Sequence, residues 1–327
     1  MTLLDVCQVA RHFGAKKGLI GGADKPVRAL DGVSFSLSAG DVLGIVGESG
    51  CGKSTLGRLI AGLDAPSRGE IRLEGTAINA PGRRRYRKSV RRDIQMIFQD
   101  PFASLSPRRT VAQTLIEPLR NFGLARGRRK QRVMELLDAV GLPENAAEKL
   151  PHEFSGGQRQ RIGIARALAA EPKLIVADEA VAALDVSIQA QIVNLLSDLR
   201  KDLGLSLIFI SHDMAVIEHI SNRVAVMYLG QIVEIGDASR LFTAPAHPYT
   251  RALIAATPTP DPRLGPIEVT AQGEIPSPRS PPPGCRFHTR CPIAQERCRL
   301  EEPQLRQRGD DGSLVACHFP RSEFIRA

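Results

Sequence analysis

The stretch "GESGCGKST" (Gly47–Thr55) has the residue types and spacing of a phosphate-binding loop. It follows an apolar run typical of a strand and precedes a helical pattern, which is the context such a loop needs. Its glycines let backbone N–H groups surround a β-phosphate, Lys53 brings a positive charge to the phosphates, and the Ser54 hydroxyl is placed to bind Mg²⁺. The stretch predicts a nucleoside triphosphate site formed by Gly47, Glu48, Ser49, Gly50, Cys51, Gly52, Lys53, Ser54 and Thr55.

Two adjacent carboxylates end the apolar run "LIVADE". Side chains alternate along a strand, so Asp178 and Glu179 should point in different directions and do different work. Asp178 can hold the Mg²⁺ through its water shell, and Glu179 can polarise the water that attacks the γ-phosphate. Such a pair alone is usually only a strand end. Together with the phosphate loop it predicts a hydrolytic site.

Two further polar residues follow buried-strand patterns, Gln99 in "IFQDP" and His212 in "FISHD". A lone histidine after a strand is more often structural than catalytic. Ligands bind at the carboxyl ends of parallel strands, however, and this favours a catalytic role beside a phosphate loop. Gln99 suits holding the metal or the attacking water.

A second candidate phosphate site begins "SGGQRQRIGIARAL" (Ser155–Leu168). Ser155 can cap a helix, two glycines bare the N–H groups of its first turn, and three arginines follow: Arg159, Arg161 and Arg166. A helix N-terminus carries roughly +0.5 of an elementary charge and unpaired N–H donors, so phosphate suits it. The chain therefore has two phosphate-binding patterns about a hundred residues apart.

The elements that must position these residues alternate between strand-like and helical patterns from about Leu3 to Thr243. This alternation predicts an α/β fold with a largely parallel sheet, with strands at 41–47, 172–179 and 205–210. Between 99 and 171 the pattern becomes helical, which predicts an inserted helical subdomain. Proline-rich segments and four cysteines follow Pro245. We therefore predict a nucleotide-binding domain at 1–245 and a C-terminal extension at 246–327.

Composition limits the class of protein. The 327 residues are 43% hydrophobic and 24% charged, as in ordinary globular chains. The apolar stretches are short of the ~20 residues of a membrane span, and the N-terminus lacks the features of a secretory signal, so a cytosolic location is expected. The net charge of +9 gathers in 83–92 and 126–132. Few aromatics and no stacking motif accompany these runs, so a solvated surface or anionic lipid explains them as well as nucleic acid, which is not predicted as a partner.

"SGGQ", together with the phosphate loop and the carboxylates, resembles the nucleotide-binding subunit of ABC transporters over roughly residues 1–245. In that family two ATP molecules lie between the phosphate loop of one subunit and the "SGGQ" helix of another, which would explain the two sites. The resemblance implies that Phe13 stacks on adenine, Gln99 links the site to membrane subunits, and His212 contacts the γ-phosphate. It also implies a dimer contact at Asp185 and a contact with the partner's nucleotide at Ser155, Gly156, Gly157 and Gln158.

One departure from the family's pattern lies between Glu179 and Asp185. The family usually has Glu-Pro-x-Ser-Ala-Leu-Asp, whereas this chain has "EAVAALD", with Ala180 and Ala182. No catalytic group is lost. The change bears on the geometry of the loop that crosses the dimer.

The stretches "HPYTRALIAATPTPDP" and "GEIPSPRSPPPGCRFHTRCP" closely resemble the C-terminal extension of ATP-binding subunits of oligopeptide and dipeptide importers, especially the second ("F") of two paired ATPases. Nickel and antimicrobial-peptide importers share it. The resemblance implies ATP hydrolysis that energises peptide import at the cytoplasmic face of the inner membrane. It implies a second ATPase subunit (as a heterodimer or a homodimer), two permeases and, indirectly, an extracytoplasmic binding protein. A soluble ABC ATPase acting on ribosomes or nucleic acid is the alternative, which the single phosphate loop and the tail disfavour.

The tail contains four of the six cysteines, Cys285, Cys291, Cys298 and Cys317. Disulfides are not expected in a reducing cytosol. The spacing is looser than in zinc knuckles, and four thiolates can hold a [4Fe–4S] cluster, which tolerates irregular spacing. Related importer subunits are thought to carry such a cluster. An iron–sulfur cluster of structural role is therefore the first hypothesis, zinc the second, and free thiols the third.

Overall fold

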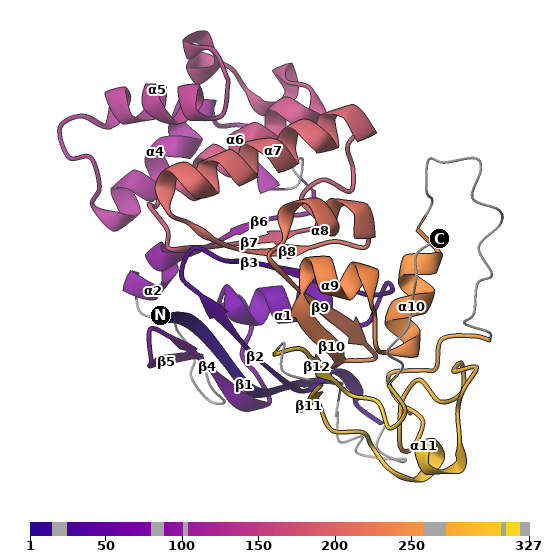
Figure 1. Ribbon diagram of the computed structural model, residues 1–327. Helices are drawn as coiled ribbons and strands as arrows, with labels where there is room; N and C mark the ends of the chain where they lie inside the picture. Colours follow the sequence, from indigo (N-terminus) through magenta and orange to yellow (C-terminus); the bar gives the residue numbers. More distant parts are fainter. Residues whose placement is uncertain (15–24, 80–87, 101–103, 258–272, 309–311, 321–327) are drawn as a thin grey trace, which may run out of the picture.

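The strands that precede the predicted site residues belong to one eight-stranded sheet (Figure 1). The computed structural model describes residues 1–14, 25–79, 88–100, 104–257, 273–308 and 312–320. The strand order is β11-β12-β10-β9-β3-β8-β7-β6, and β6, β7, β8, β3 and β9 pair in parallel. The strands are β3 (Val42–Val46), β6 (Ile94–Ile97), β7 (Leu174–Asp178), β8 (Ser206–Ile210), β9 (Arg223–Tyr228), β10 (Gln231–Asp237), β11 (Arg306–Gln307) and β12 (Leu314–Val315). The predicted α/β class with a largely parallel sheet is confirmed.

A second, antiparallel sheet has the order β2-β1-β4-β5 and was not predicted from the sequence. Its strands are β1 (Thr2–Phe13), β2 (Val27–Ser38), β4 (Arg68–Leu73) and β5 (Thr76–Asn79). The pairing of β1 with β2 shifts register at several places, and Gln8 within β1 has a φ of 48°. Such irregularities interrupt the simple alternation by which a strand is recognised in a sequence.

The helices from α4 to α6 fall inside the predicted insertion at 99–171 and gather on one side of the large sheet (Figure 1). Local signals fix their ends: α4 begins with a Thr110–Gln113 capping box and ends at Gly123 in the left-handed conformation. The helices are α1 (Lys53–Ile60), α2 (Lys88–Asp93), α4 (Val111–Phe122), α5 (Arg129–Ala139), η1 (Glu144–Glu148), η2 (Pro151–Glu153), α6 (Gly156–Leu168), α7 (Val186–Leu203), α8 (Met214–Ile220), α9 (Ala238–Thr243), α10 (Pro248–Ala255) and α11 (Glu296–Leu300).

The two faces of the large sheet pack into different cores. Ile45, Val176 and Ile210 belong to the core that contains Leu56 and Leu59 of α1. The residues that follow or precede them in the strands, such as Val46, Ala177 and Phe209, pack instead with α6, α7 and α8. Because successive strand residues face opposite ways, α1 and α6 lie on opposite sides of the sheet. The helices that begin at the two phosphate-binding patterns, α1 and α6, therefore cover opposite faces of the large sheet.

The C-terminal extension returns to the large sheet. Its strand β12 pairs antiparallel with β10, matching Val315 with Glu234, and β11 pairs with β12. Phe287 is buried against the rings of Tyr228 and Tyr249, with ring centroids 5.3 Å and 5.4 Å away. The division near Pro245 stays a prediction, but the segment after it shares both a sheet and a core with the rest of the chain.

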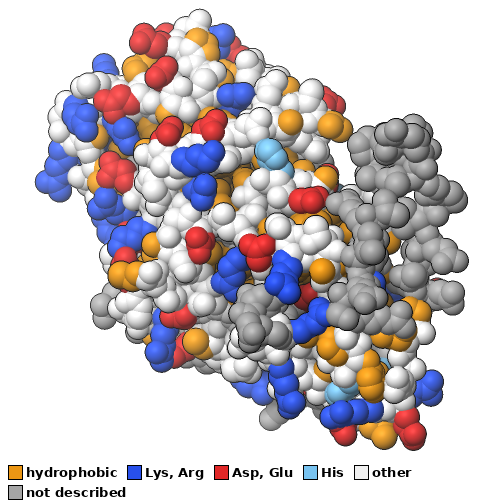
Figure 2. Space-filling view, in the orientation of Figure 1, with side chains coloured by type: hydrophobic (Ala, Val, Ile, Leu, Met, Phe, Trp, Pro, Cys, Tyr) orange, Lys and Arg blue, Asp and Glu red, His pale blue; other side chains and the backbone are white. Residues whose placement is uncertain are grey.

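Charges of both signs are mixed over the face shown in Figure 2. In the helical subdomain Arg128 and Arg132 both pair with Glu135, so part of the basic run at 126–132 is locally neutralised. Within the other run, residues 83–87 lie outside the described residues and 88–92 form most of α2. None of the helices in the described part of the chain has the length and apolar character needed to cross a membrane.

Candidate nucleotide-binding and catalytic site

The phosphate loop turns between β3 and α1 through glycines in the left-handed region. Gly47 and Gly52 have φ values of 151° and 110°, and a Cβ there would lie 2.2 Å from the Met227 oxygen and 2.3 Å from the Ala29 oxygen. Any side chain at these two positions would therefore collide with backbone. Gly50, at a φ of 77°, has open space around it, so it is required for its conformation alone.

Lys53 is the first residue of α1 and its side chain is buried. Its Nζ donates to the Gly47 oxygen at 2.7 Å and to the Glu48 oxygen at 3.1 Å, which holds the ammonium inside the curl of the loop. The Cys51 thiol is buried in the core beside α1, so this residue has only its backbone to offer a ligand. The loop thus holds the Lys53 ammonium on its own carbonyl oxygens, and the oxygens of a bound phosphate would take their place.

The predicted magnesium ligands Ser54 and Asp178 touch each other. The Ser54 hydroxyl donates to Asp178 Oδ1 at 2.8 Å, joining the start of α1 to the end of β7. Burial raises the pKa of Asp178, and the hydrogen bond from Ser54 opposes that shift. A hydroxyl and a carboxylate are the oxygen donors that Mg²⁺ prefers, and a bound cation would offset the buried negative charge. The pair therefore fits the ion, which would supply charge neutralisation at the phosphates.

Gln99, Glu179 and His212 come together although they lie far apart in the chain. Gln99 Nε2 donates to Glu179 Oε2 at 2.7 Å, and His212 Nδ1 lies 3.7 Å from Glu179 Oε1. The three follow β6, β7 and β8, which are adjacent in the sheet. The Glu179 side chain is 17% exposed and the His212 side chain 61% exposed, so the group opens to solvent on the histidine's side.

Glu179 itself has a strained backbone. Its φ is 46°, and its N–H donates to the Ile210 oxygen at 2.9 Å. A non-glycine residue held in this region costs of order 1 kcal/mol or more, and such strain gathers at functional sites. Strand alternation was expected to separate Asp178 from Glu179. The structure ends β7 at Asp178, so the separation arises from this left-handed turn instead.

The "SGGQ" segment forms a capping box at the start of α6. Ser155 Oγ accepts the Gln158 N–H at 3.3 Å, and Gln158 Oε1 accepts the Ser155 N–H at 3.0 Å, while both residues remain exposed. The arginines that follow serve the subdomain's own backbone rather than an anion. They donate to the carbonyl oxygens of other segments: Arg159 to Pro151, Arg161 to Val140 and Arg166 to Ser104.

The loop before α7 lies against this helix start. A Cβ on Gly157 would come within 2.6 Å of Ile188, and one on Gly156 within 3.4 Å of Leu184. Asp185 stands between those two contacts in sequence, is exposed, and makes no capping hydrogen bond with its side chain. The structure thus places Asp185 beside "SGGQ" on the surface. Close contact with Ile188 also explains why the second glycine has no side chain.

Phe13 ends β1, and the residue is 37% exposed. The Arg11 guanidinium lies 4.6 Å from the centre of the Phe13 ring. An exposed aromatic ring of this kind suits stacking on a purine, and its role at adenine stays a prediction.

The four C-terminal cysteines line one small cavity together with His288 and His318. Burial raises the pKa of Cys285 to about 12 and that of Cys317 to about 11. None of the four forms a disulfide within the part of the chain that the structure describes. Within the described part of the chain, however, no three His, Cys, Asp or Glu side chains are arranged to hold a metal ion. The cysteines converge, but their geometry does not support the iron–sulfur hypothesis.

The comparisons with known proteins agree with this geometry. The ABC transporter family model matches residues 30–182, and the model of the oligopeptide/dipeptide transporter C-terminal region matches 233–298. The oligopeptide transport ATP-binding protein AppF of Bacillus subtilis is 49% identical, over 97% of each chain. A probable peptide ABC transporter ATP-binding protein of Sinorhizobium fredii is 53% identical over 97% of this chain and 90% of that one. The chain belongs to the oligopeptide/dipeptide family of ABC transporter ATP-binding subunits.

Solved structures of ABC ATPases share the fold of this subunit. CbiO1 of Clostridium perfringens, part of an ABC transporter complex, is 29% identical with a TM-score of 0.62, over 74% of this chain and 90% of that one. A dimeric ATP-binding cassette with bound ADP and phosphate is 28% identical with a TM-score of 0.61, over 72% and 99%. As a member of this family the subunit is an ATPase, and it acts with a second ATPase subunit and with permeases.

Two residues that hold the phosphate loop of this ATPase subunit were missed in the sequence. Tyr249 accepts a hydrogen bond from the Glu48 N–H, and Arg290 binds the Glu48 carboxylate. Both belong to the C-terminal extension. The available sequence signal was the position of Arg290 next to Cys291, because the four cysteines predicted that this segment has a structural role.

Proposed function

We propose that this subunit drives the import of oligopeptides or dipeptides by hydrolysing ATP at the cytoplasmic face of the inner membrane. The contact of Glu179 with both Gln99 and His212, beside the Ser54–Asp178 pair, carries the hydrolytic part of the proposal. The peptide cargo is supported by the relatives' names and by the match to the transporter C-terminal region. Nickel or antimicrobial peptides are the alternative cargoes.

In the proposed chemistry, Glu179 accepts the proton of the attacking water as it approaches the γ-phosphorus. Gln99 orients the Glu179 carboxylate through its amide N–H and has an amide oxygen left for that water. His212 lies on the exposed side of Glu179, where it can donate to a γ-phosphate oxygen. Ser54 and Asp178 hold Mg²⁺, and Lys53 releases its loop carbonyls to bind phosphate oxygens.

Reconstitution tests the transport function. The subunit is placed in proteoliposomes with candidate peptide-importer permeases and a second ATPase subunit. We expect the ATPase rate to rise when the binding protein is added with its peptide, and labelled peptide to enter the vesicles. ATP hydrolysis that responds to ribosomes or DNA instead would support the soluble ABC ATPase.

We further propose a dimer with a second ATPase, preferably a paralogue, because the curated relatives include several "F" subunits of peptide systems. The exposed capping box at Ser155–Gln158 and the exposed Asp185 beside it support a surface that completes a partner's nucleotide site. Phe13 would hold the adenine at the subunit's own site.

A groove beside Gln99 is the proposed docking place of a permease. It lies between the end of α1, β6 and α4, and its apolar floor includes Leu63 and Phe98, which are 50% and 38% exposed. Side chains of both signs, Arg91 and Glu117, line it. Gln99 follows Phe98 directly and donates a hydrogen bond to Glu179, so a displacement of Phe98 by a permease would shift the Glu179 carboxylate.

Capture by the detergent-solubilised permeases tests the groove. Leu63→Asp should abolish co-purification with the permeases while ATP binding by the free subunit remains. Leu203→Asp is the matched control, because Leu203 is similarly exposed at the end of α7 and should retain capture. Equal capture of both variants would remove the groove from the interface.

For the C-terminal cysteines we keep the proposal of a structural iron–sulfur cluster, with zinc second. The proposal rests on the lining of one cavity by Cys285, Cys291, Cys298 and Cys317, and not on a ready-made set of metal ligands among the described residues. Protein purified anaerobically should be brown, absorb near about 400 nm and contain about four irons per chain. Colourless protein with one zinc would assign the site to zinc, and metal-free protein would leave free thiols.

A further inference from the structure

The polar groups of Glu48, the second residue of the phosphate loop, are bound from outside the loop as well as within it. The carboxylate receives two hydrogen bonds from Arg290, at 2.8 Å and 2.9 Å. The backbone N–H donates to the Tyr249 hydroxyl at 2.8 Å, and the carbonyl accepts from Lys53 at 3.1 Å. Arg290 and Tyr249 both come from the C-terminal extension, about two hundred residues or more away in sequence.

Arg290 reaches Glu48 through an aromatic enclosure. Its side chain is only 9% exposed, and its guanidinium carbon lies 5.8 Å from the Tyr228 ring centre and 5.9 Å from that of Phe287. The bond to Glu48 raises the pKa of Arg290, so the guanidinium stays charged. A bidentate pair shielded from water is stronger and better oriented than a surface pair.

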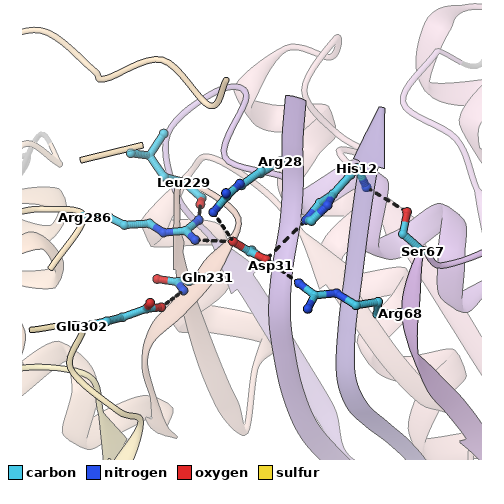
Figure 3. Close-up of polar contacts among 9 residues, drawn as sticks. All are labelled: His12, Arg28, Asp31, Ser67, Arg68, Leu229, Gln231, Arg286 and Glu302. Atoms are coloured by element: carbon cyan, nitrogen blue, oxygen red, sulfur yellow. Dashed lines mark hydrogen bonds and ion pairs between the residues drawn. The ribbon is translucent and has the colours of Figure 1, made fainter. Parts of the chain in front are cut away.

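A second arginine of the same segment contacts the small sheet that carries Phe13. Arg286, 7% exposed, pairs with Asp31 of β2 and donates to the Leu229 oxygen. Figure 3 shows that His12 meets the same Asp31 carboxylate from β1. His12 precedes Phe13, the residue proposed to stack on adenine. The two arginines of Cys285–Cys291 therefore contact the phosphate loop and the small sheet, respectively.

We propose that Cys285–Cys291 is a strap that positions the phosphate loop for ATP, with Arg290 as a positioning residue that acts through Glu48. A carboxylate in a loop built for phosphates would repel the triphosphate and would pull the loop toward solvent. Arg290 neutralises that carboxylate, and Tyr249 fixes the backbone N–H of the same residue. Because Arg286 and Arg290 adjoin Cys285 and Cys291, the packing of the cysteine cavity determines whether the strap reaches the loop.

The proposal rests on the ATP site and not on the transported cargo, so it is tested by nucleotide binding. ATP affinity, KM and kcat are measured for Arg290→Gln, Arg290→Lys, Glu48→Gln and the double variant Glu48→Gln/Arg290→Gln. We expect Arg290→Gln to weaken ATP binding and raise KM by about 10- to 100-fold, the effect of unpairing the partly buried Glu48 carboxylate, with kcat changed less than about threefold. Arg290→Lys should recover part of the affinity.

The double variant separates positioning from direct contact with nucleotide. Since Glu48→Gln removes the uncompensated carboxylate, the double variant should bind ATP better than Arg290→Gln alone. Additive losses, a fall in kcat at unchanged KM, or unchanged affinity in Arg290→Gln would each overturn the proposal.

Two further variants distinguish a specific effect on the phosphate loop from general disruption of the C-terminal extension. Tyr249→Phe removes only the hydroxyl that accepts the Glu48 N–H, so it should raise KM by a few-fold with a normal melting temperature. Arg297→Gln breaks an exposed ion pair with Glu301 in the same extension and should leave ATP binding unchanged. Equal losses of ATP affinity in Arg297→Gln and Arg290→Gln would contradict a specific strap.

Discussion

Replacing Glu179 by glutamine removes the carboxylate that Gln99 and His212 both face. The substitution keeps the shape of the side chain, and the new amide oxygen can still accept the hydrogen bond from Gln99 Nε2. We therefore expect ATP to bind normally while the proton of the attacking water has no acceptor. The perturbation isolates general-base chemistry from nucleotide binding.

The expected size follows from these contacts. A positioned general base contributes about 10²–10⁴ in rate, which corresponds to about 3–5 kcal/mol at 1.36 kcal/mol per decade. The structural cost is smaller: the Glu179 side chain is 17% exposed and the retained hydrogen bond contributes about 1 kcal/mol. The rate of ATP hydrolysis should therefore fall by several powers of ten, while the free energy of unfolding changes little.

Single-turnover hydrolysis at saturating ATP and Mg²⁺ measures the chemical step, and calorimetry measures ATP binding separately. Asp198→Asn is the control, since it removes an exposed carboxylate on α7. We expect a fall of 10²–10⁴ in the single-turnover rate for Glu179→Gln, none for the control, and an ATP Kd within about threefold of wild type in both. Near-normal turnover in Glu179→Gln would refute its role as the base.

Three other substitutions test the remaining parts of the nucleotide site. Lys53→Ala should weaken ATP binding by about 10- to 100-fold, because a charged hydrogen-bond donor is lost in the ground state; unchanged calorimetric affinity would contradict this. Phe13→Ala should weaken ATP binding by about tenfold and leave binding of inorganic triphosphate unchanged, so equal losses for both ligands would exclude stacking. Burial raises the pKa of Asp178 above its unfolded value, so its stabilising contribution is present at low pH and is lost as pH rises through the folded pKa. Asp178→Asn should accordingly raise the melting temperature of the nucleotide-free protein by about 2 °C near neutral pH, with a gain that disappears toward pH 4; a pH-independent gain in thermal scans would exclude this cause.

The sequence was sufficient where function depends on local pattern. The apolar runs before Gln99, Asp178 and His212 predicted three strand ends, and these ends are adjacent in the sheet. The spacing of the glycines predicted a loop that curls around phosphate, and Gly47, Gly50 and Gly52 have positive φ values in the turn between β3 and α1. Periodicity and turn chemistry act over a few residues, so both can be recognised without a structure.

The sequence was insufficient where a contact joins distant segments. The pairing of Arg290 with Glu48 spans 242 residues, and nothing in either neighbourhood specifies the other. Arg166 looked available for an anion, yet it is largely buried and donates to the Ser104 carbonyl. The partners of such side chains depend on the packing of the whole domain, and a short stretch of sequence does not contain that information.

We proposed that the nucleotide site of this subunit is completed by the "SGGQ" surface of a second ATPase. Sedimentation velocity of Glu179→Gln, alone and co-expressed with a paralogous ATPase subunit, tests it most directly. We predict that ATP and Mg²⁺ double the mass in at least one pairing. Adding Gly156→Asp to this chain, and the matching substitution to a paralogous partner, should prevent this because a carboxylate would face the γ-phosphate. Gly156 is suited to the test because a Cβ there meets Leu184 only at 3.4 Å. A mass of one chain at saturating ATP in both pairings, or dimers that persist with Gly156→Asp, would contradict the shared site.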